Sequence, residues 1–318
     1  MNETKWKMES QRHYFGKALL TLGRENPKVV VVGADTTESL KTVMFGKEFP
    51  HRLFNIGIAE QSMIGVAAGL AASGKIAFAA TYAVFGTAQV YHVIRQSVAY
   101  PKLNVKIFCS HAGPTVGPDG ATHQMNEDIG LMRGLPNMTV IVPCDALEME
   151  RMVHAAAAWE GPIYCRFSRS DCPTITSPND TFTIGRATVM RDGSDVTLIG
   201  CGIMVSRCLE AAEKLKQANI KARVVNMSTI KPLDIEVVKE AAKETGAIVT
   251  AEEHSIVHGL GSVIAMEVSK GKPVPVESIG VPDIFGMSGE AYELLETYGL
   301  TTEKIVQTAK QVVKRRGG

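Results

Sequence analysis

A glutamate stands where a short apolar segment passes into a run of small and apolar residues. Glu60 follows the apolar residues 54–57 and opens a helix-like run that ends before Gly74. The helix dipole favours a carboxylate in a first turn, which explains Glu60 without any function. Because Ile58 and Met63 are apolar, the carboxyl would also be partly desolvated and could share a proton with a nitrogen of a bound heterocycle. Position alone leaves both interpretations open.

An aromatic residue, Phe85, follows the strand predicted at residues 75–81. The carboxyl ends of parallel strands form the edge at which open α/β sheets bind ligands. A ring at this edge can stack on a planar ligand. A phenylalanine of the hydrophobic core is the commoner explanation for such spacing, so Phe85 gains weight only together with other residues.

Two histidines and an aspartate lie in a segment that is rich in glycine and proline. His111, Asp119 and His123 fall within residues 111–126, where four of the six positions 113–118 are Gly or Pro. This composition predicts a loop, and long loops in compact domains are often functional. The histidine spacing does not match an H-x-x-x-H metal site on a helix. We therefore expect no metal ligands here and favour contacts with a polar small-molecule substrate.

Two arginines and a serine could bind a phosphate. Arg12 lies near the start of a predicted helix, Arg169 follows a predicted strand, and Ser39 follows the first strand. The planar guanidinium fork matches the geometry of a phosphate. A serine hydroxyl can donate to a phosphate oxygen or cap a helix. Taken singly, each arginine is more simply explained as a solvated surface charge.

Strand-like and helix-like runs alternate along the chain, which predicts parallel sheets covered by helices on both faces. We therefore expect two three-layer α/β domains, at residues 8–170 and 185–318, with residues 171–184 as a linker. The predicted strands are 28–33, 54–57, 75–81, 105–110, 139–142, 163–167, 196–201, 222–226 and 247–251. The predicted helices are 11–22, 60–72, 87–100, 146–158, 204–217, 235–245, 261–269, 289–298 and 302–314.

Composition narrows the class of protein. Of the 318 residues, 45% are hydrophobic and 21% are charged, which is enough to bury a core in each domain. A net charge of +1 gives no basic surface for nucleic acid, and no apolar run is long enough to cross a membrane. The charged N-terminus is not typical of a signal peptide, and the six cysteines form no C-x-x-C pair. These features predict reduced core thiols in a cytoplasmic protein.

Together these segments resemble one family, transketolase, in order, spacing and residue type. The resemblance is to the C-terminal half of that enzyme and covers nearly the whole chain. The matching segments are Gly33-Ala-Asp35-x-x-x-Ser39, Gly57-Ile-Ala-Glu60-Gln61, Asp119-Gly-Ala-Thr-His123-Gln124, Pro136-Asn-Met138 with Pro143-Cys-Asp145, and an expected turn at Glu252-Glu253-His254. The resemblance implies a pyrimidine-binding thiamine-diphosphate domain followed by a smaller transketolase C-terminal α/β domain.

The resemblance also implies a role for each candidate residue. Glu60 would bind N1′ of the aminopyrimidine of thiamine diphosphate and activate the cofactor, and Phe85 would stack on the same ring. Ile58 and Asp35 would lie near the cofactor. The implied substrate contacts are His111 and His123 near the reacting carbons, Asp119 at a sugar hydroxyl, and Arg12, Ser39 and Arg169 at the phosphate.

Two departures from the family pattern matter. The G-D-G…N motif, which binds Mg²⁺ and the pyrophosphate of the cofactor in that family, is absent from the sequence. The resemblance therefore implies an N-terminal-half partner subunit that carries the Mg²⁺ ligands, in a heterotetramer with active sites at the subunit interfaces. In addition, Ala88 stands where relatives usually carry Tyr or Arg near the pyrimidine, so that contact would be missing.

Other assignments remain open. The C-terminal half of 1-deoxyxylulose-5-phosphate synthase shares the segment around Glu60, but that enzyme is normally one chain. The β subunit of a 2-oxo-acid dehydrogenase is split in the same way, but it has no need for Arg12 and Arg169 as phosphate ligands. A non-catalytic subunit would have lost residues such as Glu60 and His123, which are present. The favoured prediction is a two-chain transketolase that moves a two-carbon ketol unit from a ketose phosphate to an aldose phosphate, with pentose phosphates as the default substrates.

Overall fold

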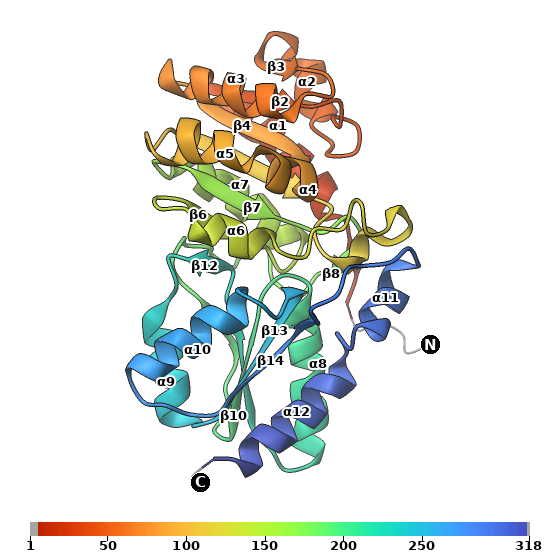
Figure 1. The fold of residues 1–318 in the computed structure, drawn as a ribbon, viewed down its shortest axis with the longest axis vertical. Helices are drawn as coiled ribbons and strands as arrows, with labels where there is room; N and C mark the ends of the chain where they lie inside the picture. Colours follow the sequence, from red (N-terminus) through yellow and green to blue (C-terminus); the bar gives the residue numbers. More distant parts are fainter. Residues whose placement is uncertain (1–5, 317–318) are drawn as a thin grey trace.

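The chain folds around two β-sheets, one in each half (Figure 1). The computed structural model describes residues 6–316. The first sheet has the strand order β12-β6-β7-β5-β4-β2-β3, and only its β12 edge is antiparallel. Its strands are β2 (Val29–Gly33), β3 (Leu53–Asn55), β4 (Ile76–Tyr82), β5 (Val105–Ser110), β6 (Thr139–Ile141), β7 (Ile163–Arg166) and β12 (Thr229–Lys231).

Helices cover both faces of this sheet, as the alternating pattern predicts. They are α1 (Gln11–Glu25), α2 (Val43–Glu48), α3 (Glu60–Ala72), α4 (Ala83–Gly86), α5 (Tyr91–Ile94), α6 (Asp128–Gly134) and α7 (Ala146–Ala158). Successive side chains of a strand point to opposite faces. Val29 and Val31 of β2 accordingly share a core with α1 and α7, whereas Val30 and Val32 share one with α3. All four valines are buried, which is typical of a central parallel strand.

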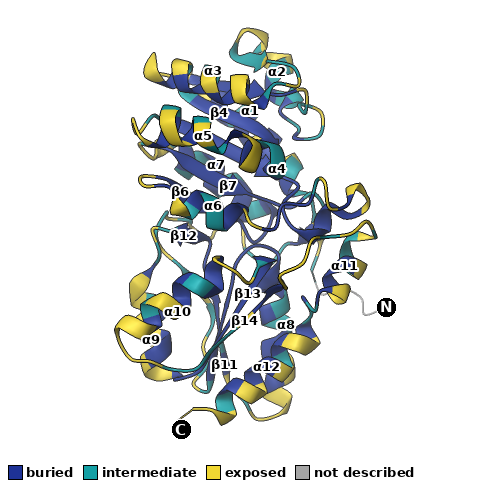
Figure 2. Cartoon of the chain, in the orientation of Figure 1, coloured by how far each residue is buried: buried dark blue, intermediate teal, exposed yellow. Residues whose placement is uncertain are grey.

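The second half repeats this plan on a smaller scale. Its sheet has the order β14-β13-β10-β11-β9 and is parallel except at the β9 edge. The strands are β9 (Thr188–Arg191), β10 (Val196–Gly200), β11 (Ala222–Asn226), β13 (Ile248–Ser255) and β14 (Val276–Val281). The helices are α8 (Met204–Gln217), α9 (Ile235–Glu244), α10 (Leu260–Lys270), α11 (Ala291–Thr297) and α12 (Thr302–Lys314). The central strands of both sheets are buried, and the outer faces of the helices are exposed (Figure 2).

All six cysteines are buried and free, as predicted for core thiols. Within residues 6–316, no helix combines the length and apolar character that a membrane crossing requires.

One predicted helix is wrong in detail. Residues 87–100 form three short pieces, namely η2 (Ala88–Val90), α5 and the π-helix η3 (Arg95–Ala99). The break has a backbone cause, because Thr87 (φ −127°, ψ −82°) and Val90 (φ −118°, ψ 12°) both leave the helical region.

The segment predicted as a loop at residues 111–126 contains a short helix. A 3₁₀ helix, η4 (Pro114–Asp119), is kinked at Gly117, which has a φ of 77°. Glycine adopts this left-handed conformation without steric cost, so the glycine and proline content shapes the segment rather than disordering it. The expected linker at residues 171–184 likewise includes a strand, β8 (Cys172–Pro173), which pairs with β1 (Met8–Glu9).

A strand from the second half completes the first sheet, which the sequence did not predict. Thr229 of β12 lies opposite Ile141 of β6 in an antiparallel pair. The Lys231 ammonium then donates to the carbonyl oxygens of Arg133 (3.0 Å) and Leu135 (2.6 Å). The two halves therefore share backbone hydrogen bonds as well as side-chain contacts.

A buried ion pair joins α6 to β7 next to this junction. Arg166 Nε lies 2.9 Å from Asp128 Oδ2, and the two side chains are 4% and 0% exposed. The Tyr164 hydroxyl donates to the same carboxylate oxygen at 2.7 Å, and Arg166 Nη1 donates to the carbonyl oxygen of Glu253 in β13 at 2.9 Å. One guanidinium thus links the first sheet to the second.

We predict that Arg166→Met lowers the free energy of unfolding by about 3–5 kcal/mol, because it leaves Asp128 charged and buried without its partner. Arg24→Met is the matched control, since Arg24 pairs with Glu48 at the surface. Urea denaturation of the purified chains measures both changes. Similar effects of the two substitutions would contradict the importance given to the buried pair.

Candidate functional site

Aromatic rings from the ends of two neighbouring strands form a cluster. The Tyr82 ring, at the end of β4, stacks on His111, which follows β5, with centroids 3.7 Å apart and an interplanar angle of 18°. Phe85 lies 6.0 Å from Tyr82, and His123 meets the edge of Phe85 at 5.5 Å. The structure therefore brings together the rings of three candidate residues, Phe85, His111 and His123. Tyr82 lies at the centre of this ring cluster, because it contacts all three of these residues. Tyr82 is missing from the residues predicted from the sequence, and its position at the end of a strand is the only sequence signal that could have indicated it.

Ser39 connects Arg12 to this cluster through Tyr82, and Arg169 acts on Arg12 through its charge. Arg12 Nη1 donates to the Ser39 carbonyl oxygen at 3.1 Å, and the Tyr82 hydroxyl donates to Ser39 Oγ at 2.9 Å. Arg12 Nε is buried and has no hydrogen-bond partner among the described residues. Burial, and next the charge of Arg169, lower the pKa of Arg12. The positive charge of Arg169 thus acts on a partly buried Arg12, which suits a bound anion.

Neighbouring groups determine the protonation of His111 and the orientation of both histidine rings. Burial first, and then the charges of Arg12 and Arg169, lower the pKa of His111 to about 3, so its ring is neutral at neutral pH. A hydroxyl residue precedes each histidine and bonds to its Nδ1: Ser110 Oγ at 2.6 Å for His111, and Thr122 Oγ1 at 2.9 Å for His123. Each Nε2 is left for a ligand. A hydroxyl residue just before each histidine is a sequence signal that was overlooked.

Glu60 begins α3 and is 6% exposed. Among the described residues its carboxylate accepts one side-chain hydrogen bond, a long one of 3.4 Å from Gln89 Nε2. A nearly buried carboxylate with spare acceptor capacity fits the ring nitrogen of an aminopyrimidine, and the half-buried ring of Phe85 could stack on the flat face of such a ligand. Ile58, two residues earlier, is 83% exposed, which is unusual for an isoleucine unless something covers it.

The two remaining candidates lie at the margin. Asp35 is exposed in a left-handed conformation (φ 57°), and its Oδ1 accepts from Asn55 Nδ2 at 3.3 Å. Asp119 is exposed at the end of η4 and has no side-chain hydrogen bond or ion pair with another described residue. Both side chains are exposed, and neither makes a hydrogen bond with a residue of the ring cluster.

The second half of the chain holds both ends of the segment that carries the histidines. The Thr115 amide donates to Glu253 Oε1 at 2.7 Å, and Gln124 Nε2 donates to the Met287 carbonyl oxygen at 2.9 Å. A Cβ at Gly113, where φ is 77°, would come within 2.6 Å of the Glu253 carboxylate, so only glycine fits there. The conformation of this segment therefore depends on residues more than 100 positions away.

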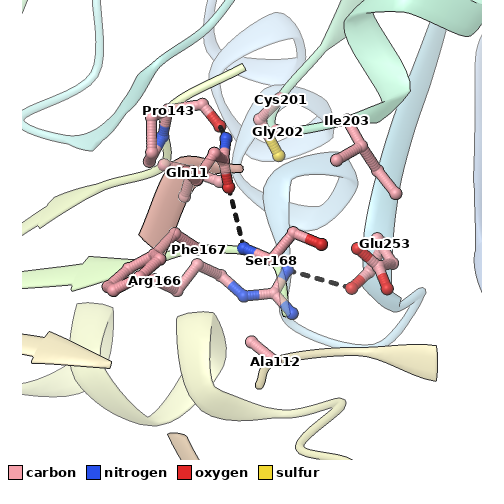
Figure 3. Close-up of a pocket in the computed structure, with 11 residues that line it drawn as sticks. Gln11, Ala112, Pro143, Arg166, Phe167, Ser168, Cys201, Gly202, Ile203 and Glu253 are labelled. Carbon is pink, nitrogen blue, oxygen red and sulfur yellow. Dashed lines mark hydrogen bonds between the residues drawn. The ribbon is translucent and has the colours of Figure 1, made fainter. Parts of the chain in front are cut away.

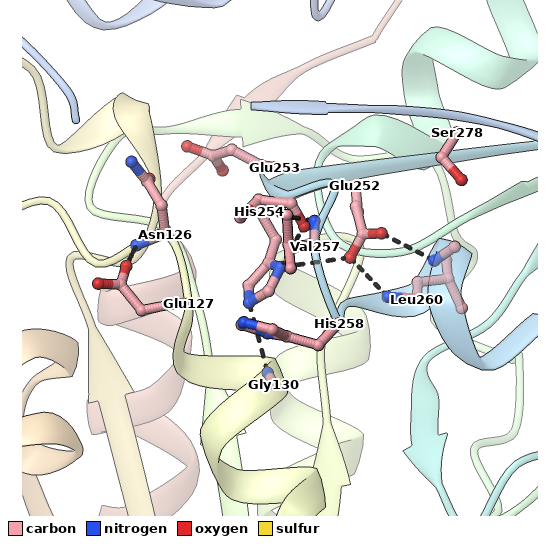
Figure 4. A network of polar contacts seen from close by, with 12 residues as sticks. Asn126, Glu127, Gly130, Glu252, Glu253, His254, Val257, His258, Leu260 and Ser278 are labelled. Atoms are coloured by element: carbon pink, nitrogen blue, oxygen red, sulfur yellow. Dashed lines mark hydrogen bonds and ion pairs between the residues drawn. The ribbon is translucent and has the colours of Figure 1, made fainter. Parts of the chain in front are cut away.

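The segment Glu252–His254 was expected to form a turn, and that is wrong: it belongs to β13 and is fully buried (Figure 4). Glu252 accepts from the amides of Leu260 (2.7 Å) and Gly261 (2.8 Å) at the start of α10. Burial raises the pKa of Glu252 and of Glu253 to about 7, and lowers that of His254 to about 4. These groups are structural and lie at the junction of the halves.

Two of the hollows along this junction differ greatly in size. A cavity of about 10 Å³, enough for about one water molecule, is lined by the polar side chains of Gln11, Arg166, Ser168 and Glu253 (Figure 3). An open hollow of about 490 Å³ lies beside Ala88. Its other lining residues include Val84, Gln124, His258 and Phe285. Only the second is large enough for a ligand or a partner's side chains. Across residues 6–316, no three His, Cys, Asp or Glu side chains are grouped as metal ligands.

We predict that the stability advantage of Glu253→Gln over the wild type grows as pH rises. The folded chain keeps the Glu253 proton up to about pH 7, whereas a glutamate ordinarily loses it near 4.5. The contribution of the protonated group is therefore complete below pH 4.5 and lost as pH rises through 7, by up to about 3 kcal/mol. Denaturant unfolding at pH 5, 6, 7 and 8 measures the difference, and a pH-independent difference would contradict it.

Comparison with known proteins agrees with this geometry. Residues 8–174 match the family model of the transketolase pyrimidine-binding domain, and residues 185–305 match that of the transketolase C-terminal domain. The chain is 45% identical to a transketolase C-terminal section from Methanocaldococcus jannaschii, over 96% of this chain and 97% of the relative. It is 41% identical to the 6-deoxy-6-sulfo-D-fructose transketolase subunit of Clostridium sp. (strain MSTE9), over 94% and 92%.

A solved structure shows the same fold. It is a split-gene transketolase in the form of an inactive β4 tetramer, 48% identical, with a TM-score of 0.89 over 96% of this chain and 98% of the other. The two family models match consecutive parts of this chain, and the relatives and the solved structure match it over almost their whole length. The chain therefore belongs to the transketolase family, as a C-terminal-half subunit with a pyrimidine-binding domain and a C-terminal domain.

Proposed function

We propose that this chain is the C-terminal-half subunit of a two-chain transketolase that transfers a two-carbon ketol unit from a ketose phosphate to an aldose phosphate. One observation carries the proposal. The ring of Phe85 shares a cluster with the neutral His111 and with His123, and Tyr82 connects this cluster to Ser39 and to Arg12, on which the charge of Arg169 acts. This order matches a cofactor ring, a sugar chain and a terminal phosphate.

Glu60 and Phe85 would hold the aminopyrimidine of thiamine diphosphate. The bound cofactor supplies the chemistry that breaks and forms the carbon–carbon bond. Glu60 would exchange a proton with the ring nitrogen N1′, and its burial would exclude water from that contact. Ile58 would cover part of the cofactor, and Asp35 would approach it from the open side.

The substrate residues divide into two groups. His111 and His123 would contact substrate oxygens near the reacting carbons through Nε2, because their Nδ1 atoms are already bonded. Asp119 would accept from a sugar hydroxyl. Arg12, Ser39 and Arg169 would bind the phosphate.

The partner in this proposal is an N-terminal-half subunit that supplies the pyrophosphate and Mg²⁺ sites, in a heterotetramer. The open hollow beside Ala88 and the exposed apolar side chains Ile58 (83%), Ile284 (55%) and Phe285 (88%) support a covering chain. The similar split-gene protein forms a β4 tetramer that is inactive, which supports self-association of such chains and a need for a second subunit.

The identity of the sugar substrates is the most specific part of the proposal. We take pentose phosphates as the substrates, although the Clostridium relative carries the name of a sulfo-sugar enzyme. The proposed domains span residues 8–170 and 185–318, with 171–184 between them. The buried free thiols fit a reducing compartment, and we place the enzyme in the cytoplasm.

We predict that activity requires both subunits and Glu60. The chain would be mixed with its N-terminal-half partner, thiamine diphosphate and Mg²⁺, and ketol transfer from xylulose 5-phosphate to ribose 5-phosphate would be followed. Glu60→Ala should lower kcat by about 10²- to 10⁴-fold, because it removes an acid–base group. Glu38→Ala, an exposed glutamate of the same domain, is the control and should retain activity.

A folded assembly without ketol transfer would reject pentose phosphates as substrates. Turnover of pyruvate by that assembly would move the assignment to one of the related thiamine-diphosphate enzymes. Activity of the chain alone would reject the two-chain proposal.

A further inference from the structure

Tyr82 touches both chemical parts of the proposed site. Its ring stacks on His111, and the same ring lies 6.0 Å from Phe85 and 6.4 Å from His123. Its hydroxyl points the other way along the site, to Ser39 Oγ at 2.9 Å. Tyr82 is half-buried at the last position of β4, so its backbone is fixed by the sheet. It thus connects the histidines with the cationic end of the site.

The direction of the Tyr82–Ser39 bond determines what Ser39 can do. A serine hydroxyl has one proton to donate and two lone pairs to accept with. Because Tyr82 fills a lone pair of Ser39 Oγ, the Ser39 proton stays available for an acceptor outside this pair. A hydroxyl that accepts one bond also donates a stronger one, since linked hydrogen bonds polarise each other.

The surroundings of Ser39 favour an anionic acceptor. Arg12 donates to the carbonyl oxygen of Ser39 itself and keeps a buried Nε without a partner. Arg169 is close enough for its charge to act on Arg12, and among the described residues it has no carboxylate partner. Two cations and an oriented hydroxyl with a free proton form a donor set for the oxygens of a phosphate.

We infer that Tyr82 is a positioning residue that sets substrate specificity: its hydroxyl orients Ser39 so that the Ser39 O–H donates to the terminal phosphate of the sugar. This inference rests on the proposed function and deepens it, because it assigns the selection of phosphorylated sugars to a bond that the chain itself makes. The ring of Tyr82 holds His111 in the same arrangement. One side chain thereby fixes the distance between the phosphate end and the reacting end of the substrate.

A double-mutant cycle on the full chain tests the bond directly. The dissociation constant for inorganic phosphate would be measured by calorimetry for the wild type, Tyr82→Phe, Ser39→Ala and the double variant. Removing a hydrogen bond to a charged group should weaken binding by about 5- to 10-fold in each single variant. The double variant should bind no more than about twofold weaker than Ser39→Ala, because both changes remove the same bond.

Tyr91→Phe is the matched control. Tyr91 is a half-buried tyrosine of the same domain, and its hydroxyl makes no hydrogen bond within residues 6–316, so phosphate binding should not change. Wild-type affinity in Tyr82→Phe would overturn the inference, as would fully additive losses in the double variant. A wild-type chain that does not bind phosphate would also overturn it.

Kinetics of the assembled two-chain enzyme separate this inference from the proposed function. Tyr82→Phe should raise KM for a phosphorylated ketose by about 5- to 10-fold, and kcat should change less than KM. The KM for the same ketose without its phosphate should stay unchanged. An active enzyme whose KM for the phosphorylated ketose is unchanged by Tyr82→Phe would overturn the role of Tyr82 alone. An inactive assembly whose phosphate binding still depends on Tyr82 through Ser39 would reject the proposed function and support the role of Tyr82.

Discussion

The buried Asp128–Arg166 ion pair is the interaction on which the rest of the structure depends. It ties α6 to β7 in the first half, and its guanidinium reaches the backbone of Glu253 in the second half. The side chain of Glu253 in turn accepts the amide of Thr115, at the start of the segment that carries His123. A buried charge is tolerated only when it is paired and hydrogen-bonded, so these contacts require one arrangement of the two halves.

The candidate site combines residues at the ends of strands with residues of an irregular segment that the second half of the chain binds. Tyr82 and His111 come from the ends of strands, where the sheet fixes their positions. His123 comes from an irregular segment, which Glu253 and the Met287 carbonyl bind at its two ends through Thr115 and Gln124. The C-terminal domain thus has a structural function in the site although, among the described residues, it contributes no side chain to the ring cluster. Preorganised groups of this kind are what a site needs for oriented substrate binding.

Much of the fold follows from the sequence because local patterns determine it. The valines of β2, the cap of α1 by Ser10, and the small residues of α3 all have local signals. The family resemblance implied one site for Phe85, His111 and His123, and their rings lie in one cluster of the structure. The contribution of β12 to the first sheet, and the burial of Glu253 against Gly113, depend on contacts between distant segments, for which one sequence holds no local signal. Tyr82 was overlooked because a tyrosine at a strand end is ordinary until its neighbours are known.

The central claim is that the second half of the chain fixes the conformation of the histidine-bearing segment. Hydrogen–deuterium exchange of the wild type and of Glu253→Ala measures this directly, with the peptide that covers β2 as an internal reference for global unfolding. We expect faster exchange in residues 113–126 of the variant and unchanged exchange in β2, because the Thr115 amide loses its acceptor. Equal exchange of residues 113–126 in both proteins would contradict the claim and show that this segment keeps its shape without the second half.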